Sequence, residues 1–173
     1  MKTILLLRHA KSDWSIPSLA DIDRPLAQRG IKDAPVMGNA LSRAGLFPDM
    51  IVSSPAKRAA ETAELAAAVL EYDRPIEIVP NLYPGSPGEI LHVLKQLPLH
   101  VQIVMIVGHN PALEETVSAL LCTGTHGTVR VRIPTAALLC LKAEIAGWSE
   151  LEGGVCVLAW MVTPKLLKSL KGK

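Results

Sequence analysis

Short apolar runs alternate along the chain with segments in which apolar residues recur at helical spacing. This alternation is typical of an α/β domain built on a largely parallel sheet. Short apolar runs bounded by turn residues favour strands that are buried on both faces. The sequence predicts four successive buried strands at 3–7, 50–53, 76–79 and 102–107, and two later strands at 136–142 and 155–161.

Three helices are predicted between these strands from apolar residues that share one face. The first ends near Gly45 and Pro48, and Pro35 marks either a kink or the effective start of this helix. The second follows Pro55 and the third follows Pro111, each within a few residues of a predicted strand. The shared faces consist of Val36, Ala40, Leu41 and Ala44 in the first helix, Ala59, Ala63, Ala66 and Leu70 in the second, and Leu113, Val117 and Leu120 in the third.

Length and composition limit what the chain can be. With 173 residues it has the usual size of one domain, and no repeat or linker divides it, although 124–127 has the composition of a loop. We therefore expect a single domain over 1–173. The 18 Lys and Arg residues nearly balance the 16 Asp and Glu residues, so no nucleic acid or anionic membrane is expected as a partner.

The sequence also bears on where the protein resides. The apolar run before Arg8 is too short for a signal peptide, and no small-residue cleavage site follows it. No later stretch reaches the roughly 18 uninterrupted apolar residues that a membrane span needs. Cys122, Cys140 and Cys156 are odd in number and widely spaced, which favours reduced, buried thiols. These features predict a cytoplasmic protein.

Polar residues follow three of the predicted strands. Arg8 and His9 come after the first strand, Arg58 follows the second, and His109 follows the fourth. Ligands of parallel α/β sheets bind beyond the carboxyl ends of the strands. If these three strands are neighbours, the four side chains converge on one pocket.

This combination of side chains suits phosphoryl transfer. A guanidinium group of Arg8 or Arg58 can bind two phosphate oxygens at once, which neutralises charge and fixes orientation. A neutral His9 can attack phosphorus through one ring nitrogen when the other nitrogen is held as a donor. The neighbouring guanidinium charges disfavour its protonation. His109 can donate to an oxygen on which charge develops in the transition state.

Four blocks of sequence extend the pattern beyond these side chains: 7–11 (LRHAK), 23–30 (DRPLAQRG), 53–63 (SSPAKRAAETA) and 107–111 (VGHNP), with a closing segment at 160–165 (WMVTPK). The first block resembles the opening motif of the histidine phosphatase superfamily, formerly grouped around phosphoglycerate mutase. The order and spacing of all the blocks are similar to those of SixA-type phosphohistidine phosphatases. The resemblance spans almost the whole chain.

The resemblance implies a fold and a set of roles. The fold is a phosphoglycerate mutase-like, three-layer α/β sandwich in which helices flank a mostly parallel sheet. His9 is the nucleophile, Arg8, Arg58 and His109 form the phosphate pocket, and no metal or cofactor takes part. Three further residues are substrate-binding candidates, each with a structural alternative. Arg24 either contacts substrate or orders its loop, and we slightly favour the ordering role. Lys11 either contacts a phosphoprotein or is simply exposed. Asn110 either binds substrate or caps the helix that follows it.

A general acid is not evident from the sequence. Glu89 lies in the region where relatives that cleave phosphate esters carry an acidic residue. However, Ser86, Pro87 and Glu89 also have the spacing of a helix start, with Ser86 at the N-cap and Glu89 folding back, and we favour this interpretation. Asp13 and Asp21 are other possible acids on a loop of unknown shape.

The missing acid bears on the substrate. Water can protonate the second ring nitrogen of phosphohistidine, so this leaving group needs no acid from the enzyme. We therefore expect hydrolysis of phosphohistidine on a protein, for example one that serves in signalling or phosphotransfer. The alternatives are a phosphatase for small phosphate esters, or a non-catalytic module that binds phosphoproteins. A metal site on His9 and His109 is disfavoured, because no metal-ligand spacing supports it and two arginines would repel the cation.

Overall fold

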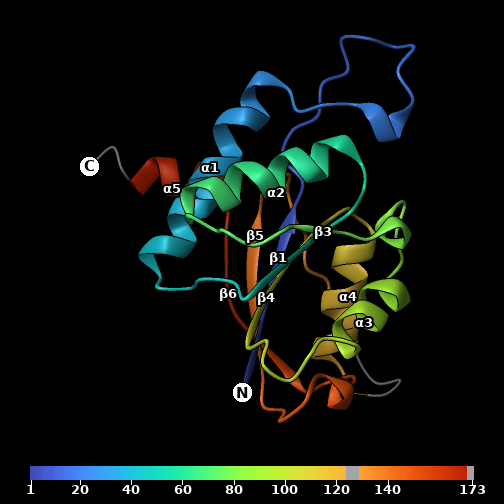
Figure 1. The fold of residues 1–173 in the computed structure, drawn as a ribbon, viewed down its shortest axis with the longest axis vertical. Helices are drawn as coiled ribbons and strands as arrows, with labels where there is room; N and C mark the ends of the chain where they lie inside the picture. The colour runs from blue at the N-terminus through green and yellow to red at the C-terminus, as the bar shows by residue number, and fades with distance from the viewer. Residues whose placement is uncertain (124–128, 171–173) are drawn as a thin grey trace.

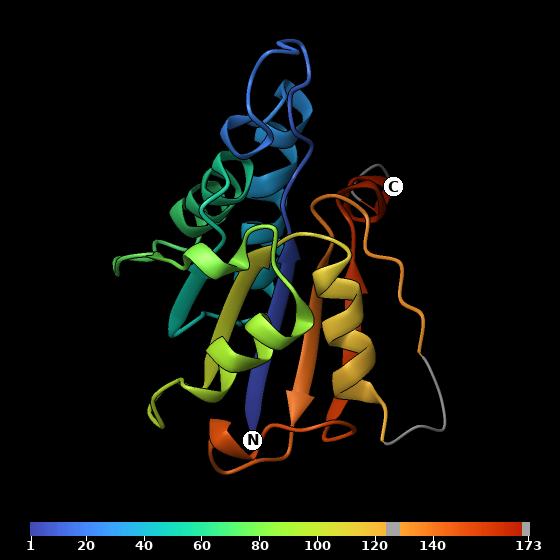
Figure 2. The same ribbon diagram turned by 90° about the vertical axis from the view of Figure 1, so that its right-hand side faces the viewer.

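The computed structural model describes residues 1–123 and 129–170. Within these residues six strands form one sheet in the order β3-β2-β4-β1-β5-β6, with helices on both faces (Figures 1 and 2). The pairs β3–β2, β2–β4 and β4–β1 are parallel, whereas β5 runs antiparallel to β1 and β6. The predicted mostly parallel, three-layer α/β domain is therefore confirmed. The strands are β1 (Lys2–Arg8), β2 (Met50–Ser53), β3 (Glu77–Ile78), β4 (Ile103–Gly108), β5 (Leu138–Ala143) and β6 (Cys156–Val162).

In the described part of the chain, five α-helices cover the two faces of the sheet. The first two pack against each other on one face, and the third and fourth pack together on the other (Figure 1). The fifth, near the end of the chain, contacts the first. The helices are α1 (Gln28–Arg43), α2 (Lys57–Val69), α3 (Pro87–Lys95), α4 (Ala112–Leu121) and α5 (Pro164–Leu170), with 3-10 turns at Asp21–Asp23, Pro80–Leu82 and Trp148–Glu150.

Strand β1 lies in the interior of the sheet and contributes to both layers of the core. Its side chains alternate in direction, as in any strand. Ile4 and Leu6 pack with apolar residues of α3 and α4, whereas Leu5 and Leu7 pack with those of α1 and α2. All four are fully buried. The unbroken apolar run before Arg8 thus reflects a strand with helices on both faces.

Two details differ from the sequence prediction. Segment 76–79 is not a buried strand, because only Glu77–Ile78 pairs with β2, at the edge of the sheet, and both residues are exposed. Helix α1 begins at Gln28, well before Pro35, so Pro35 lies in its interior. Gly30 in the first turn allows this early start, because a Cβ there would overlap the carbonyl oxygen of Lys11. The loop predicted at 124–127 lies outside the described residues.

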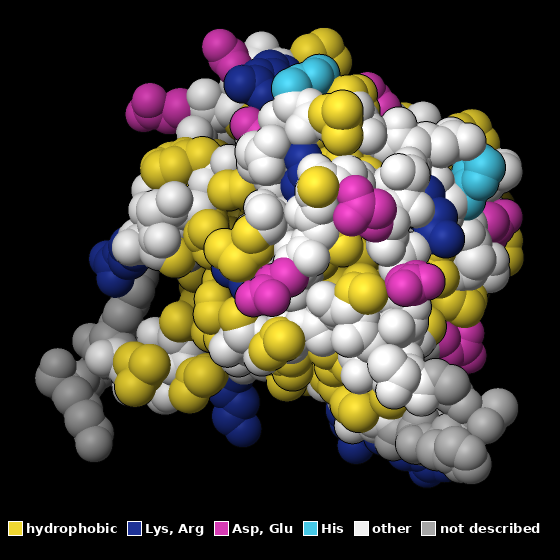
Figure 3. Space-filling view, turned by 90° about the horizontal axis from the view of Figure 1, so that it is seen from below, with side chains coloured by type: hydrophobic (Ala, Val, Ile, Leu, Met, Phe, Trp, Pro, Cys, Tyr) yellow, Lys and Arg dark blue, Asp and Glu magenta, His cyan; other side chains and the backbone are white. Residues whose placement is uncertain are grey.

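The other strand and helix predictions agree with the structure to within about two residues at the strand ends. None of the described helices combines the length and apolar character needed to cross a membrane. Figure 3 shows the end of the molecule where β1 begins, and there basic, acidic and apolar side chains are interspersed.

Candidate active site

The three strands that carry the predicted site residues are neighbours in the sheet. Strands β2, β4 and β1 lie side by side and run in the same direction, so their carboxyl ends meet at one edge. Arg8 at the end of β1 is level with Gly108 at the end of β4. The structure therefore brings His9, Arg58 and His109 together beside Arg8, as the strand-end argument predicts.

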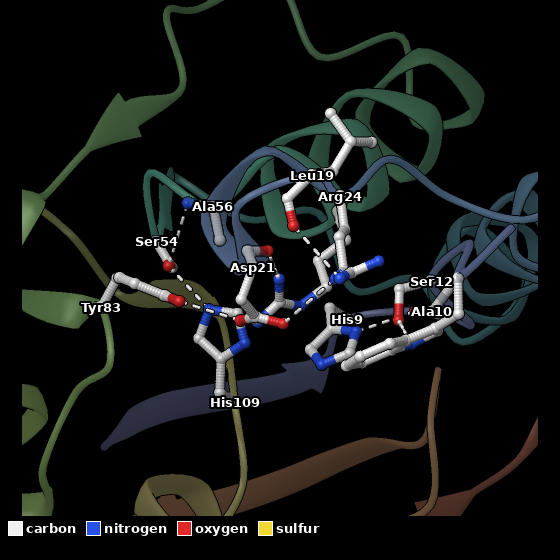
Figure 4. A network of polar contacts seen from close by, with 12 residues as sticks. His9, Ala10, Ser12, Leu19, Asp21, Arg24, Ser54, Ala56, Tyr83 and His109 are labelled. Carbon is white, nitrogen blue, oxygen red and sulfur yellow. Dashed lines mark hydrogen bonds and ion pairs between the residues drawn. The ribbon is translucent and has the colours of Figure 1, made fainter. Parts of the chain in front are cut away.

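His9 is held with one ring nitrogen engaged and the other available. Its Nδ1 lies 2.8 Å from the carbonyl oxygen of Ala10, which can only accept, so Nδ1 carries the proton (Figure 4). Its Nε2 has no hydrogen bond with another described residue. Burial, together with the charges of Arg58 and Arg8, lowers the pKa of His9 to about 4, although the hydrogen bond to Ala10 acts in the opposite direction. His9 is therefore neutral near pH 7, with a free lone pair on Nε2.

His109 is held next to His9, with their ring centroids 4.9 Å apart. Its Nε2 lies 2.7 Å from the hydroxyl oxygen of Ser54, and that oxygen accepts from the backbone N–H of Ala56. The Ser54 hydrogen is then free to point at Nε2, which favours the ring proton on Nδ1. Nδ1 is buried and has no partner among the described residues. Burial, followed by the influence of His9 and Arg58, lowers the pKa of His109 to about 3, so its ring is also neutral.

The two arginines differ in how many of their N–H donors form hydrogen bonds with other residues. Arg8 donates from Nη1 to the carbonyl oxygen of Ile133 at 2.7 Å, while its buried Nε has no partner within the described part of the chain. Arg58 is buried and donates from Nη2 to the Asp21 carboxylate at 2.8 Å, and from Nη1 to the Asp21 carbonyl. Burial lowers the pKa of Arg8, against the opposing charge of Glu114. The pocket thus combines two guanidinium groups with two buried, unused donors, Arg8 Nε and His109 Nδ1.

Three residues of the pocket are not singled out by the sequence. Ser54 contacts His109 as described, and Thr62 accepts from the backbone N–H of Ala10 while donating to the carbonyl of Arg58. Tyr83 packs edge-on against His109 and donates to the Asp21 carboxylate at 2.8 Å. Ser54 has a detectable signal, since it follows a predicted strand directly, but Tyr83 does not.

The other predicted substrate-binding residues have contacts of their own. Arg24 donates to three loop carbonyls, those of Ile16, Pro17 and Leu19, and its guanidinium stacks on the ring of Trp14 at 4.1 Å. These contacts order the loop between β1 and α1. Lys11 is exposed.

Asn110 and Glu89 are tied to local structure. Asn110 donates from its amide to Glu114 at 2.6 Å and to the carbonyl of Ile133 at 2.9 Å, so it braces the segment that also contacts Arg8. Ser86 caps α3 by accepting from the backbone N–H of Glu89, with Pro87 as the first helical residue. The Glu89 carboxylate makes no hydrogen bond or ion pair with another described residue, so the reciprocal half of the capping box is not formed. Among residues 1–123 and 129–170, no three His, Cys, Asp or Glu side chains cluster as a metal site would require.

Comparison with known proteins places this site in a family. The model of the histidine phosphatase superfamily (branch 1) matches residues 4–90. A protein of Mycobacterium tuberculosis described as uncharacterised is 33% identical over 166 residues, which cover 92% of this chain and all of that protein. The chain therefore belongs to the histidine phosphatase superfamily.

Solved structures narrow the class. A protein histidine phosphatase SixA complexed with tungstate has the same fold, with a TM-score of 0.80 at 23% identity over 95% of this chain and 99% of that one. A provisionally assigned phosphohistidine phosphatase SixA from Agrobacterium tumefaciens is 26% identical, with a TM-score of 0.75 over 94% of this chain and 99% of that one. Within the superfamily the chain is of the SixA type, which supports histidine-phosphatase-type activity on a phosphorylated substrate.

Proposed function

We propose that this protein hydrolyses phosphohistidine on a protein substrate through a covalent phosphohistidine intermediate on His9. The arrangement of His9 is the observation that carries the proposal. Its Nδ1 donates to the Ala10 carbonyl at 2.8 Å, its ring is neutral, and its Nε2 is free. A nucleophilic imidazole requires all three of these features.

The groups around His9 suit the phosphoryl group that it would attack. Arg8 and Arg58 supply the positive charge that the peripheral oxygens require. Arg8 Nε and His109 Nδ1 are buried donors without a partner among the described residues, and a buried donor of this kind is costly unless a ligand satisfies it. Because His109 is neutral, it offers a hydrogen bond rather than a charge.

Phosphohistidine fits the site better than a phosphate ester does. An alkoxide leaving group needs a proton from a general acid, whereas a phosphorylated imidazole can be protonated by water. Glu89, the acid candidate in the sequence, lies at the start of α3, and its carboxylate makes no hydrogen bond or ion pair with a described residue of the pocket. A cytoplasmic protein of a signalling or phosphotransfer system is the kind of substrate that we propose.

Trapping the intermediate tests the catalytic step. Enzyme incubated with a labelled histidine-phosphorylated peptide and quenched in alkali should retain label, and acid should release it, because phosphorus–nitrogen bonds survive base and break in acid. The label should map to the peptide that contains Arg8 and His9. Vanadate should inhibit competitively, and chelators should have no effect. An acid-stable adduct, label on another residue, or activity that needs a divalent metal would refute the mechanism.

A substrate panel tests the specificity. Purified protein should be given a histidine-phosphorylated protein, phosphoserine, a sugar phosphate and phosphoglycerate, and the kcat/KM values compared. We expect the phosphohistidine substrate to be preferred. Preference for one of the esters would indicate a small-molecule phosphatase, and binding without turnover of any substrate would indicate a phosphoprotein-binding module.

A further inference from the structure

Asp21 holds a carboxylate at the mouth of the pocket. The residue begins the 3-10 turn Asp21–Asp23 in the loop between β1 and α1, and its side chain is 46% exposed. One carboxylate oxygen, Oδ2, accepts from Arg58 Nη2 and from the Tyr83 hydroxyl, each at 2.8 Å. Figure 4 shows the side chain beside the two imidazole rings. Two residues far away in the sequence therefore fix the carboxylate next to the proposed phosphate site.

The second oxygen of this carboxylate is available. Oδ1 makes no hydrogen bond with another described residue, and its one ion pair is a loose contact with Arg24 Nε at 3.8 Å. Partial burial acts against the charge, but the hydrogen bonds from Tyr83 and Arg58 outweigh it and lower the pKa of Asp21 overall. Asp21 is therefore ionised at neutral pH. Its carboxylate can accept a hydrogen bond from an N–H or O–H group, but it cannot act as a general acid.

We propose that Oδ1 of Asp21 accepts a hydrogen bond from the substrate's own imidazolium, the leaving group of the first step. This inference rests on the proposed phosphohistidine phosphatase function and assigns the residue that recognises the leaving group. In this proposal Arg58, which contacts Asp21, also binds the phosphoryl group, and the leaving ring lies on the solvent side of that group, beside the half-exposed Asp21 carboxylate. A carboxylate is the side chain that favours the protonated form of such a ring.

The step balances without a proton from the enzyme. The substrate enters as a phosphorylated imidazolium whose other ring nitrogen bears hydrogen. The lone pair of His9 Nε2 forms the new bond to phosphorus as the substrate's phosphorus–nitrogen bond breaks, and the electrons of that bond return to the substrate nitrogen. Products are a phosphorylated His9 imidazolium, still donating from Nδ1 to Ala10, and a neutral substrate imidazole that keeps its N–H.

This arrangement discriminates between leaving groups. A carboxylate that stays ionised supplies no proton to an alkoxide, and its charge repels the oxygen on which negative charge develops. The same charge attracts the imidazolium of phosphohistidine. Asp21 therefore acts as a specificity-determining residue, distinct from the arginines, which bind the phosphoryl group whatever its leaving group is.

The test compares two substrates in one variant. Asp21→Asn keeps a side-chain oxygen that can accept from Arg58 but removes the charge. We expect kcat/KM for a histidine-phosphorylated peptide to fall by about tenfold or more, as for other hydrogen bonds to charged groups. We expect kcat/KM for p-nitrophenyl phosphate, whose leaving group needs no protonation, not to fall but to rise slightly, because the variant removes a charge that repels the developing phenolate oxygen. Asp23→Asn is the matched control, because Asp23 is an exposed carboxylate of the same turn with no side-chain hydrogen bond to a described residue, and it should affect neither substrate.

Other outcomes would overturn the inference. An equal fall for both substrates would mean that Asp21 only positions Arg58, and an equal rise would mean that it only competes with phosphate for Arg58. Tyr83→Phe removes one hydrogen-bond donor to Oδ2 of Asp21. It should lower kcat/KM for the histidine-phosphorylated peptide alone, by a smaller factor than Asp21→Asn does. A fall in kcat/KM for both substrates would also count against the assignment. Failure of the underlying function is separate, because the wild-type enzyme would then turn over p-nitrophenyl phosphate but not the phosphohistidine peptide.

Discussion

Strand β1 carries a cation at each end, Lys2 buried and Arg8 half-buried, and the two environments differ. At its start, Lys2 is 2% exposed, and its Nζ donates to the carbonyl oxygens of Leu99 and Val101 at 2.6 and 2.8 Å while lying 5.5 Å from the Trp148 ring centroid. At its end, Arg8 uses Nη1 on a carbonyl but leaves Nε without a partner in the described chain. The hydrogen bonds of Lys2 are thus supplied by other protein atoms, whereas Arg8 keeps one donor without a partner among the described residues.

The difference separates a structural cation from one available to a ligand. Buried polar groups are almost always hydrogen-bonded in native proteins, so an unused buried donor indicates a site that something else fills. His109 Nδ1 is a second unused donor in the same pocket. Burial of the amino-terminal cation therefore points to stability, and burial of the pocket groups points to binding.

Replacing the nucleophile should give the largest effect. His9→Ala removes the atom that forms the covalent bond, so we expect turnover of any phosphorylated substrate to fall by several orders of magnitude. Thermal unfolding should show a folded protein, because the only side-chain hydrogen bond of His9 to a described residue is to the carbonyl of the neighbouring Ala10. Activity near the wild-type level would show that the pocket does not work through His9.

Loss of a pocket arginine should come next. Arg58→Ala removes a guanidinium that would stabilise the peripheral oxygens, and we expect kcat/KM for p-nitrophenyl phosphate to fall by roughly 10² to 10³. Lys57→Ala is the control, because Lys57 is an exposed cation one residue earlier in α2. Equal losses in the two variants would mean that general positive charge matters, and not the fork of Arg58.

The pocket should also make stability depend on pH in a way that the Lys2 end does not. The folded pKa values of His9 and His109, about 4 and about 3, lie below the ordinary value of 6.5. The unfolded chain therefore binds more protons between about pH 6.5 and 4, so stability is fully present above this window and is lost as pH falls. We expect a loss on the order of 1 to 2 kcal/mol per histidine between pH 7 and 5.

Urea unfolding at several pH values measures this loss. His109→Ala should have a shallower slope between pH 7 and 5 than the wild type, whatever its absolute stability. Lys2→Met should keep the wild-type slope. Identical slopes in the wild type and His109→Ala would show that His109 is not held neutral by its surroundings.

At the amino-terminal end the expected effect is on stability alone. Lys2→Met keeps an unbranched side chain but removes the donor to two carbonyls, which should cost about 1 to 3 kcal/mol in urea unfolding. The cost is limited because Trp148 and Gln102 also donate to these carbonyls. Lys142→Met, which loses one bond to a threonine hydroxyl, should cost less. A large loss of activity in Lys2→Met at unchanged stability would contradict the view that Lys2 serves stability and Arg8 serves binding.

The sequence predicted the fold well because each interior strand carries its own signal. An apolar run such as 3–7 is recognisable without knowledge of its neighbours, since it must be buried on both faces. The prediction of a buried strand at 76–79 was wrong because composition does not distinguish an interior strand from one at the edge of the sheet. The start of α1 was left open, because its first turn is largely polar and Pro35 allowed either a kink or a later start.

The candidate site was predictable only as far as strand ends determine it. Arg8 ends β1, His9 and His109 directly follow β1 and β4, and Arg58 lies in the helix that β2 leads into, so neighbouring strands were enough to bring them together. The contacts of Asp21 with Arg58 and Tyr83 span 37 and 62 residues of sequence. They depend on how a loop folds over the pocket, which no local pattern specifies.

Glu89 should show the smallest effect, and it tests where the pocket ends. Its carboxylate lies in the first turn of α3, where a negative charge interacts favourably with the helix dipole. It makes no hydrogen bond or ion pair with another described residue. Glu89→Gln should therefore change kcat/KM for a histidine-phosphorylated peptide by less than about twofold, and stability by a few tenths of a kcal/mol. Ser86→Ala, which removes the side-chain cap of the same helix, should cost about 1 kcal/mol of stability with activity again unchanged. A large loss in Glu89→Gln confined to ester substrates would make Glu89 an acid for those esters, and the pocket would then extend to α3.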